Sequence, residues 1–315
     1  MLIGAPAKSR RPFYEKEAFR LKKHRQNRYI GLVYVLPFVI GLLVFQLYPF
    51  IASFFYSFTD LSIANEWEWV GLENYIKSFT ADRDFYQSLT ATAIYVFIAV
   101  PCKLVFALFI AMVLNMKIKG IRFFQTLYYI PSILGGSVAV SVIWRFMFSH
   151  DGLINAMLTT IGLPALDWLG SKSLALPTVS LLAVWQFGSS MVLFLVGLKQ
   201  IPVTLYEAAS IDGANKVHQF FKITLPMLTP TVLFNVIMQT IGAFQEFTSA
   251  MIITGGGPMK STYMYGMMLY NNSFKYYKMG YASAQSWILF VIIMAVTGLL
   301  FLSSKKWVYY EDGGR

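Results

Sequence analysis

Residues 89–114 read LTATAIYVFIAVPCKLVFALFIAMVL, an apolar run in which Lys103 is the only charged residue. Crossing a bilayer takes roughly 20 apolar residues in a helix. At 1.5 Å per residue, a helix over this run would be about 39 Å long. The stretch therefore predicts a membrane-spanning helix.

Comparable apolar runs occupy residues 29–55, 123–148, 174–198, 231–253 and 283–302. Hydrophobic residues make up 57% of the 315-residue chain and charged residues only 13%, whereas soluble domains carry about a quarter charged residues. We therefore expect an all-α membrane protein with six transmembrane helices. The single cysteine, Cys102, lies inside a predicted span and cannot form an internal disulfide.

The net charge of +11 follows a pattern typical of membrane topology rather than of nucleic-acid binding. Residues 1–28 hold nine lysines and arginines before the first apolar run. With six spans, the same side also receives Lys117, Lys119, Arg122, Lys199, Lys216, Lys222, Lys305, Lys306 and Arg315. The opposite side receives only Lys77, Arg83, Lys172, Lys260, Lys275 and Lys278. The basic side is expected to be cytoplasmic and to hold both termini.

This pattern divides the chain into three predicted parts. Residues 1–28 form a basic cytoplasmic segment, residues 29–304 the transmembrane domain, and residues 305–315 a cytoplasmic tail. We expect the lipid bilayer to be a partner of the chain, and we expect no nucleic acid among its partners.

The cytoplasmic loop 203–226 reads VTLYEAASIDGANKVHQFFKITLP. Residues 206–211 are good helix formers, Gly213 can adopt the positive φ that ends a helix, and Pro226 is tolerated at the start of the next span. The loop is therefore predicted to hold a short helix, a turn and a second helix. An ordinary amphipathic helix at the membrane surface is the alternative interpretation.

This loop resembles the EAA loop of ABC importer permeases. Glu207-Ala208-Ala209, three residues, Gly213, nine residues and then Ile223-Thr224-Leu225-Pro226 match the family spacing without a gap. Further matches to the maltose-type sugar branch lie at residues 48–49, 57–60, 70–75, 131, 144, 152–155, 198–202, 254–258 and 280–284. The chain resembles the six-helix lactose, oligosaccharide and glycerol-phosphate permeases more than it resembles the larger subunit of the maltose system.

The resemblance implies the transmembrane domain of a type I ABC importer in a bacterial cytoplasmic membrane. Its implied partners are a second homologous permease, a dimer of ATPase subunits, an extracytoplasmic sugar-binding protein and a carbohydrate. Coupling to the ATPase would use a cytoplasmic coupling helix and the turn after it, formed by Tyr206, Glu207, Ala208, Ala209, Asp212, Gly213 and Ala214. The chain itself would have no catalytic residue, because ATP and Mg²⁺ belong to the partner.

A substrate path is predicted from polar and small residues within two spans. Gln239, Gly242, Ala243 and Glu246 are spaced as one face of a helix. The resemblance adds Trp185, Gln186 and Ser189 on the preceding span. Amide and carboxylate groups can bind hydroxyls and an indole can stack on a sugar ring, whereas the alternative is plain helix packing.

Lys103, beside Pro101, is unusual within a span. It could line the path, meet a carboxylate of a partner, or bind carbonyls freed by the proline, which is the interpretation we favour. Pro101 and Pro131 both predict kinks that face protein.

We expect neither a metal nor a nucleotide on this chain. Its three histidines are too scattered along the sequence to hold a metal. Residues 255–262, GGGPMKST, are similar to a phosphate-binding loop, but Met259 stands where that loop requires glycine. Two functional alternatives stay open from the sequence: an ion-coupled secondary carrier, and an ABC importer of a solute other than a sugar.

Overall fold

The computed structural model describes residues 31–62, 67–116 and 119–309, and within these ranges every extended regular element is a helix. An antiparallel bridge pairs Thr59 with Trp69. The predicted segment 1–28, residues 29–30 of the first predicted span, Lys117 and the end of the tail lie outside the described residues. The chain divides into two compact units, Met1–Tyr56 and Ser57–Arg315.

The first unit contains one helix that is long and apolar enough to cross a membrane, Gly31–Tyr56. Within it, a π-helical turn η1 (Leu43–Leu47) leads into α2 (Tyr48–Tyr56). Pro49 explains the wider turn, because proline has no N–H to donate and its ring crowds the carbonyl four residues earlier.

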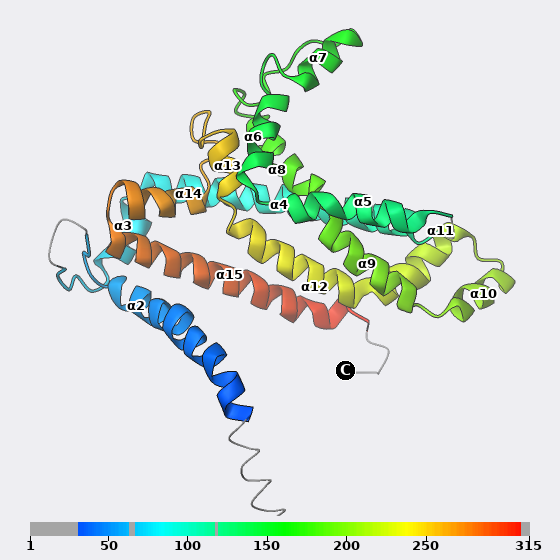
Figure 1. The fold of residues 1–315 in the computed structure, drawn as a ribbon, viewed down its shortest axis with the longest axis horizontal. Helices are drawn as coiled ribbons and strands as arrows, with labels where there is room; N and C mark the ends of the chain where they lie inside the picture. The colour runs from blue at the N-terminus through cyan, green and yellow to red at the C-terminus, as the bar shows by residue number, and fades with distance from the viewer. Residues whose placement is uncertain (1–30, 63–66, 117–118, 310–315) are drawn as a thin grey trace, which may run out of the picture. The chain divides into compact units, whose positions relative to one another are not determined.

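The second unit holds the remaining helices of the described residues. They are α3 (Glu73–Thr80), α4 (Arg83–Leu114), α5 (Ile121–Leu134), α6 (Val138–Met147), α7 (Leu153–Thr160), α8 (Ala175–Trp185), α9 (Gly188–Gln200), α10 (Val203–Ile211), α11 (Lys216–Gln219), η2 (Phe220–Thr224), α12 (Leu225–Phe244), α13 (Thr248–Ile253), α14 (Tyr265–Tyr270), η3 (Asn271–Lys275) and α15 (Met279–Trp307). Figure 1 shows α10 and α11 at one end of this unit and α3 and α14 at the other.

Helix α4 is the central element of the second unit, in contact with α8, α9, α12 and α14. Its buried residues recur every three or four positions, so they form one face of the helix. The fully buried Ala107 and Ala111 on that face let neighbouring backbones approach closely. Pro101 lies within α4, which is continuous from Arg83 to Leu114, and it is exposed on the surface of this chain.

Two hydrophobic clusters divide along α4. The cluster near its N-terminus contains Phe85 and Tyr95 together with Trp144, Phe148 and the fully buried Tyr265. The cluster near its C-terminus contains Ala107 and Ala111 with side chains of α9, α12 and the start of the loop after α9. Helices α12 and α15 run side by side in opposite directions (Figure 1).

Three of the predicted spans are not continuous helices. The span predicted at 123–148 is α5 and α6, which meet at an angle of 100° across Gly135, Gly136 and Ser137. The span at 174–198 is α8 and α9, bent by 47° at Gln186. Residues 231–253 contain most of α12 and all of α13, separated by residues 245–247. The apolar pattern predicted the runs but not their breaks.

The count of six spans agrees with the structure if each bent pair counts as one span. The described residues then contain four long apolar helices, Gly31–Tyr56, Arg83–Leu114, Lys216–Phe244 and Met279–Trp307, and two bent pairs. Helix α15 continues through Lys305 and Lys306, which the sequence placed in the tail.

A buried hydrogen-bond network joins α4, α14 and α15 at the α3 end of the unit. Asp82 Oδ1 accepts from the N–H groups of Asp84 and Phe85, which caps α4. Its other oxygen accepts from Tyr281 Oη at 2.6 Å and from Gln285 Nε2 at 3.3 Å. Gln285, fully buried, also accepts from Asn272 Nδ2 at 2.7 Å. Hydrogen bonds between polar side chains that are removed from solvent on folding therefore hold this end of the unit together.

Tyr265 completes the network from α14. Its hydroxyl donates to the Gln285 carbonyl at 2.7 Å, and its N–H donates to Thr92 Oγ1 at 2.8 Å. Burial raises the pKa of Tyr265 well above its ordinary value, so the phenol stays protonated and remains a donor.

Candidate functional site

The helix α10 coincides with the predicted coupling helix and ends in a Schellman motif. Gly213 has φ of +82°, in the left-handed region. The Ala214 N–H donates to the Ala209 carbonyl at 2.8 Å, and the Gly213 N–H donates to the Ser210 carbonyl at 3.2 Å. These two bonds satisfy carbonyls that the end of the helix would leave free. The predicted role of Gly213 as a helix terminator is confirmed.

Gln219 holds the turn after α10 in shape, a role that the sequence analysis missed. Its side chain is almost completely buried. Nε2 donates to Ser210 Oγ at 2.9 Å and to the Ala214 carbonyl at 3.2 Å, while Oε1 accepts from Lys216 Nζ at 3.2 Å. A glutamine in this loop gives no sequence signal that it is buried, so only the fold reveals it.

Tyr206 attaches α10 to the body of the second unit. Its hydroxyl lies 2.8 Å from Thr224 Oγ1 in η2, and its ring packs on the hydrophobic cluster near the C-terminus of α4. Of the predicted coupling residues, Tyr206 thus faces inward. Ala209 and Ala214 are half-buried, whereas Glu207, Ala208, Asp212 and Gly213 are exposed.

No residue of α10 is buried among the described residues. Ile211 is 88% exposed, and Val203 and Val217 are each more than 60% exposed. Beside the helix lies a hollow of about 470 Å³ whose wall includes Ala209, Asp212, His218 and Lys222. Exposed apolar side chains next to a hollow and rimmed by charges are typical of a surface that binds another protein.

The predicted substrate-path residues lie at or near the breaks in two spans. Trp185 is the last residue of α8, Gln186 lies in the break, and Ser189 is the second residue of α9. All three are half-buried or exposed. Trp185 packs on the cluster near the N-terminus of α4, and its ring centroid lies 6.1 Å from that of Trp144.

The sequence predicted that the other four path residues share one face of a helix, and this prediction is wrong. Helix α12 ends at Phe244, so it carries Gln239, Gly242 and Ala243 but not Glu246. Glu246 lies in the following break, where its Oε1 accepts from the Ser249 N–H at 2.9 Å and so caps α13. The chain turns here because the α12 hydrogen-bond ladder stops, a property that spacing alone does not reveal.

Lys103 lies within electrostatic range of Glu246 across the α4–α12 interface. The Tyr95 hydroxyl lies within range of the same carboxylate. In the described part of the chain, Lys103 makes no hydrogen bond to a backbone carbonyl, so our favoured interpretation of it as a carbonyl-binding residue is wrong. The carboxylate of Glu246, in the break between α12 and α13, thus acts electrostatically on a cation of α4.

The break between α8 and α9 is bridged by a hydroxyl of a different helix. Ser132 Oγ in α5 donates to the Gln186 carbonyl at 3.0 Å and accepts from the Ser189 N–H at 3.0 Å. Gly188 makes this approach possible, because a Cβ there would lie 2.7 Å from the Tyr128 carbonyl oxygen. Neighbouring helices of a membrane protein commonly satisfy backbone groups that a broken helix frees.

Metal-binding geometry is absent from the residues that the structure describes. Within them, no group of three or more His, Cys, Asp and Glu side chains could hold a metal ion. His150 Nδ1 lies 3.1 Å from Asp151 Oδ1 in an exposed turn. The site is therefore built from helix ends, breaks and an exposed loop.

Comparison with known sequences gives matches along most of the chain. Residues 78–309 match the family described as binding-protein-dependent transport system inner membrane component. The chain is 49% identical to the probable ABC transporter permease protein YesP of Bacillus subtilis, over 91% of this chain and 94% of that protein. It is 33% identical to the multiple sugar-binding transport system permease protein MsmF of Streptococcus mutans, over 89% of this chain and 97% of that protein.

A solved structure has the same fold. It is the crystal structure of a bacterial alginate ABC transporter in complex with an alginate pentasaccharide-bound periplasmic protein. The superposition has a TM-score of 0.78 and covers 91% of this chain and 98% of that chain, at 19% identity.

Proposed function

The chain belongs to the family of inner membrane components of binding-protein-dependent transport systems, and we propose that it carries a carbohydrate through the membrane with energy from a separate ATPase subunit. The observation that carries this proposal is α10, an exposed helix at one end of the permease with the residue spacing of an EAA loop. Such a surface offers a partner both apolar side chains and the Glu207 carboxylate.

The architecture of α10 suits the transmission of force. Its C-terminal end is fixed by the Schellman bonds and by Gln219, and its middle is fixed to η2 through Tyr206. The helix and its turn therefore move together with α12, which follows η2 without interruption. An ATPase dimer that closes beneath α10 would rotate the permease, in the manner of other alternating-access transporters.

A carbohydrate is the proposed cargo because the relatives with assigned solutes include MsmF, named for sugar transport. The chemistry around the breaks agrees with a hydroxyl-rich solute. Gln186 and Gln239 make no side-chain hydrogen bond within the described residues, and both are partly exposed. Amides in this condition are available to hydroxyls, and Trp185 offers a ring for a sugar face.

The proposed assembly contains a second homologous permease, two ATPase subunits and an extracytoplasmic sugar-binding protein. The more basic side of the chain, which includes α10, faces the cytoplasm, as do both termini. ATP and Mg²⁺ bind to the ATPase subunits rather than to this chain.

The test is uptake by the complete complex, purified with its partner subunits and reconstituted in vesicles. We expect one sugar-loaded binding protein to stimulate both ATP hydrolysis and sugar uptake. We propose that Glu207 meets a cationic group of the ATPase, so Glu207→Lys is expected to lower uptake by at least about tenfold, because the like-charge contact it creates costs several kcal/mol.

The matched control is Glu73→Lys, the same charge reversal at an exposed position in α3 at the opposite end of the unit. It should leave the coupling of hydrolysis to uptake unchanged. Wild-type coupling in Glu207→Lys, or uptake driven by an ion gradient without ATP, would refute the proposal.

A further inference from the structure

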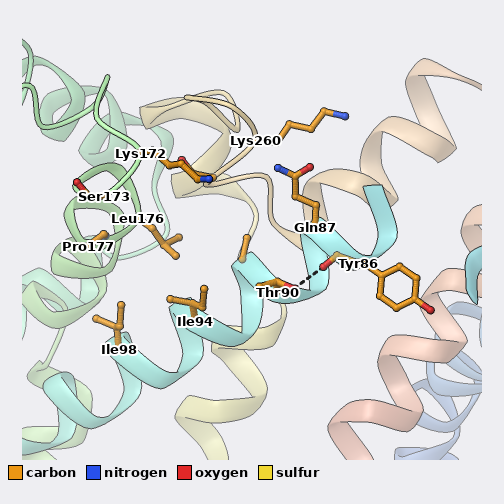
Figure 2. A pocket seen from close by; sticks show the side chains of 12 residues that line it. Tyr86, Gln87, Thr90, Ile94, Ile98, Lys172, Ser173, Leu176, Pro177 and Lys260 are labelled. Carbon is orange, nitrogen blue, oxygen red and sulfur yellow. Dashed lines mark hydrogen bonds between the residues drawn. The ribbon is translucent and has the colours of Figure 1, made fainter. Parts of the chain in front are cut away.

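A cavity of about 580 Å³ opens at the α4 N-terminus, away from α10 and outside the proposed substrate path. Its walls come from α4, from the start of α8 with the residues before it, and from the loop between α13 and α14. Figure 2 shows Ile94 and Ile98 of α4 pointing into the cavity toward Leu176 and Pro177 of α8. The floor of the cavity is therefore apolar.

The rim of the cavity is cationic and polar. Lys172, in the segment before α8, and Lys260, in the loop between α13 and α14, contribute the charges (Figure 2). Gln87 extends from α4 toward that loop. No Asp or Glu lines the cavity. The wall chemistry thus fits a molecule with a negative head and an apolar tail.

The polar and apolar residues follow the same order along α4 and along the segment that leads into α8. Along α4, Gln87 and Thr90 precede Ile94 and Ile98, a distance of about 17 Å from first to last at 1.5 Å per residue. Along the other wall, Lys172 and Ser173 precede Leu176 and Pro177. Both helices enter their apolar span in this direction, so the rim lies at headgroup depth and the floor at acyl-chain depth.

The rim also has unused binding capacity. Lys172 makes no ion pair in the described part of the chain. Ser261 lines the cavity, and its buried hydroxyl has no hydrogen-bond partner within the described residues. Lys260 is partly neutralised by Asp84, whose Oδ1 lies 2.5 Å from its Nζ.

We propose that this cavity binds an anionic phospholipid from the leaflet opposite to the one that faces α10. The phosphodiester lies at the rim, where Lys172 and Lys260 attract it and Ser261 donates to it. One acyl chain lies on the floor against Ile94, Ile98 and Leu176. A sugar fits this floor poorly, because the isoleucines and leucine offer its hydroxyls no hydrogen bonds.

The test compares two lipids on the full chain, purified in its complex and stripped of lipid in detergent. Equal amounts of phosphatidylglycerol and phosphatidylcholine are added, and retained lipids are counted by native mass spectrometry. We expect a preference for phosphatidylglycerol of about fivefold to thirtyfold, from the attraction of one or two lysines near an anionic lipid. The double variant Lys172→Gln/Lys260→Gln should reduce this preference to about onefold.

Two further variants separate a site from general surface charge. Lys275→Gln/Lys278→Gln removes the same charge from exposed positions outside the cavity, and should keep the wild-type preference. Asp84→Asn frees Lys260 of its carboxylate, and should raise the preference above wild type. A merely structural role for these side chains would not produce changes of opposite sign.

Three results would overturn the proposal. One is equal retention of the two lipids by the wild-type chain, and another is equal loss of preference in both double-lysine variants. The third is displacement of the lipid by glycerol phosphate at millimolar concentration, which would mean that the rim binds a free anion and the floor contributes nothing.

Discussion

The two ends of the second unit both depend on a glycine, for different physical reasons. Gly280, at the α15 N-terminus, sits against the chain segment 59–61, where an added Cβ would lie 2.0 Å from the Thr59 carbonyl oxygen. Gly213, after α10, has open space around it but φ of +82°. The α3 end therefore needs glycine for room, and the α10 end needs it for backbone conformation.

This contrast extends to the whole of each end. The α3 end is held by buried and half-buried residues of α4, α14, η3 and α15 that bind Asp82 or Gln285. The α10 end buries no residue of its helix and is held by local bonds from Gln219 and Tyr206. A rigid anchor thus lies at one end and an exposed, internally braced contact surface at the other.

Gly280→Ala is expected to cause the largest loss of stability. Because the clash is with backbone, the segment 59–61 must move, and we expect a loss of about 3 kcal/mol, at the upper part of the range for overpacking. The readout is thermal unfolding in detergent. Gly298→Ala, in the same helix with open space around it, is the control and should be neutral or slightly stabilising. Equal unfolding temperatures for the two variants would contradict the close packing.

Gln285→Leu is expected to follow, with a loss of about 2 kcal/mol. It leaves the Asn272 amide without its acceptor and Asp82 with one donor fewer, and an unsatisfied buried group costs about 1–3 kcal/mol. Chemical denaturation measures the change. Ser286→Ala is the control, because its hydroxyl binds only the Ala282 carbonyl of its own helix. A wild-type midpoint for Gln285→Leu would mean that the network does not anchor this end.

Gly213→Ala should have a smaller and local effect. A left-handed conformation costs a residue with a Cβ about 1 kcal/mol, and no tertiary contact changes. We expect the unfolding midpoint of the complex to stay near that of the wild type while uptake per ATP falls. Gly213→Asn, which tolerates this conformation better, should restore coupling. A large fall in the unfolding midpoint would place Gly213 in the anchored part of the unit and remove the contrast.

The Lys260–Asp84 pair should contribute least, because both side chains are about half exposed. The hydrogen bond from Lys260 to Asp84 raises the pKa of Lys260 above its ordinary value. Its contribution is therefore fully present below the pKa of an unfolded lysine, about 10.4, and is lost as the pH rises through the higher folded pKa. We expect about 0.5 kcal/mol between wild type and Lys260→Gln at pH 8, after allowance for solvent screening, and less at pH 11. A difference that grows with pH would contradict the sign.

Apolar length predicted which segments form long apolar helices or bent helix pairs, because about 20 apolar residues have few alternatives to a span. It did not predict continuity, since both halves of a broken span are equally apolar. Gly135-Gly136 was an available signal for the bend between α5 and α6, with Gly136 at a φ of +74°. The break at Gln186 had no such signal, because it depends on Ser132, more than fifty positions earlier in the chain.

The helix and turn of the loop 203–226 were predictable because their constraints are local. Gly213 and the helix before it are decided within a few residues, so spacing alone located them correctly. Glu246 was assigned to the wrong element because its place depends on where the α12 ladder ends. Gln219 was missed because burial is a property of the folded loop rather than of the residue type.

The hydroxyl of Ser132 has a mechanical consequence. It supplies both the donor and the acceptor at the α8–α9 break, so α5 cannot turn about its axis without breaking two hydrogen bonds or carrying the break with it. The bend angle between α8 and α9 is in this way coupled to the rotation of α5, which belongs to the other bent pair.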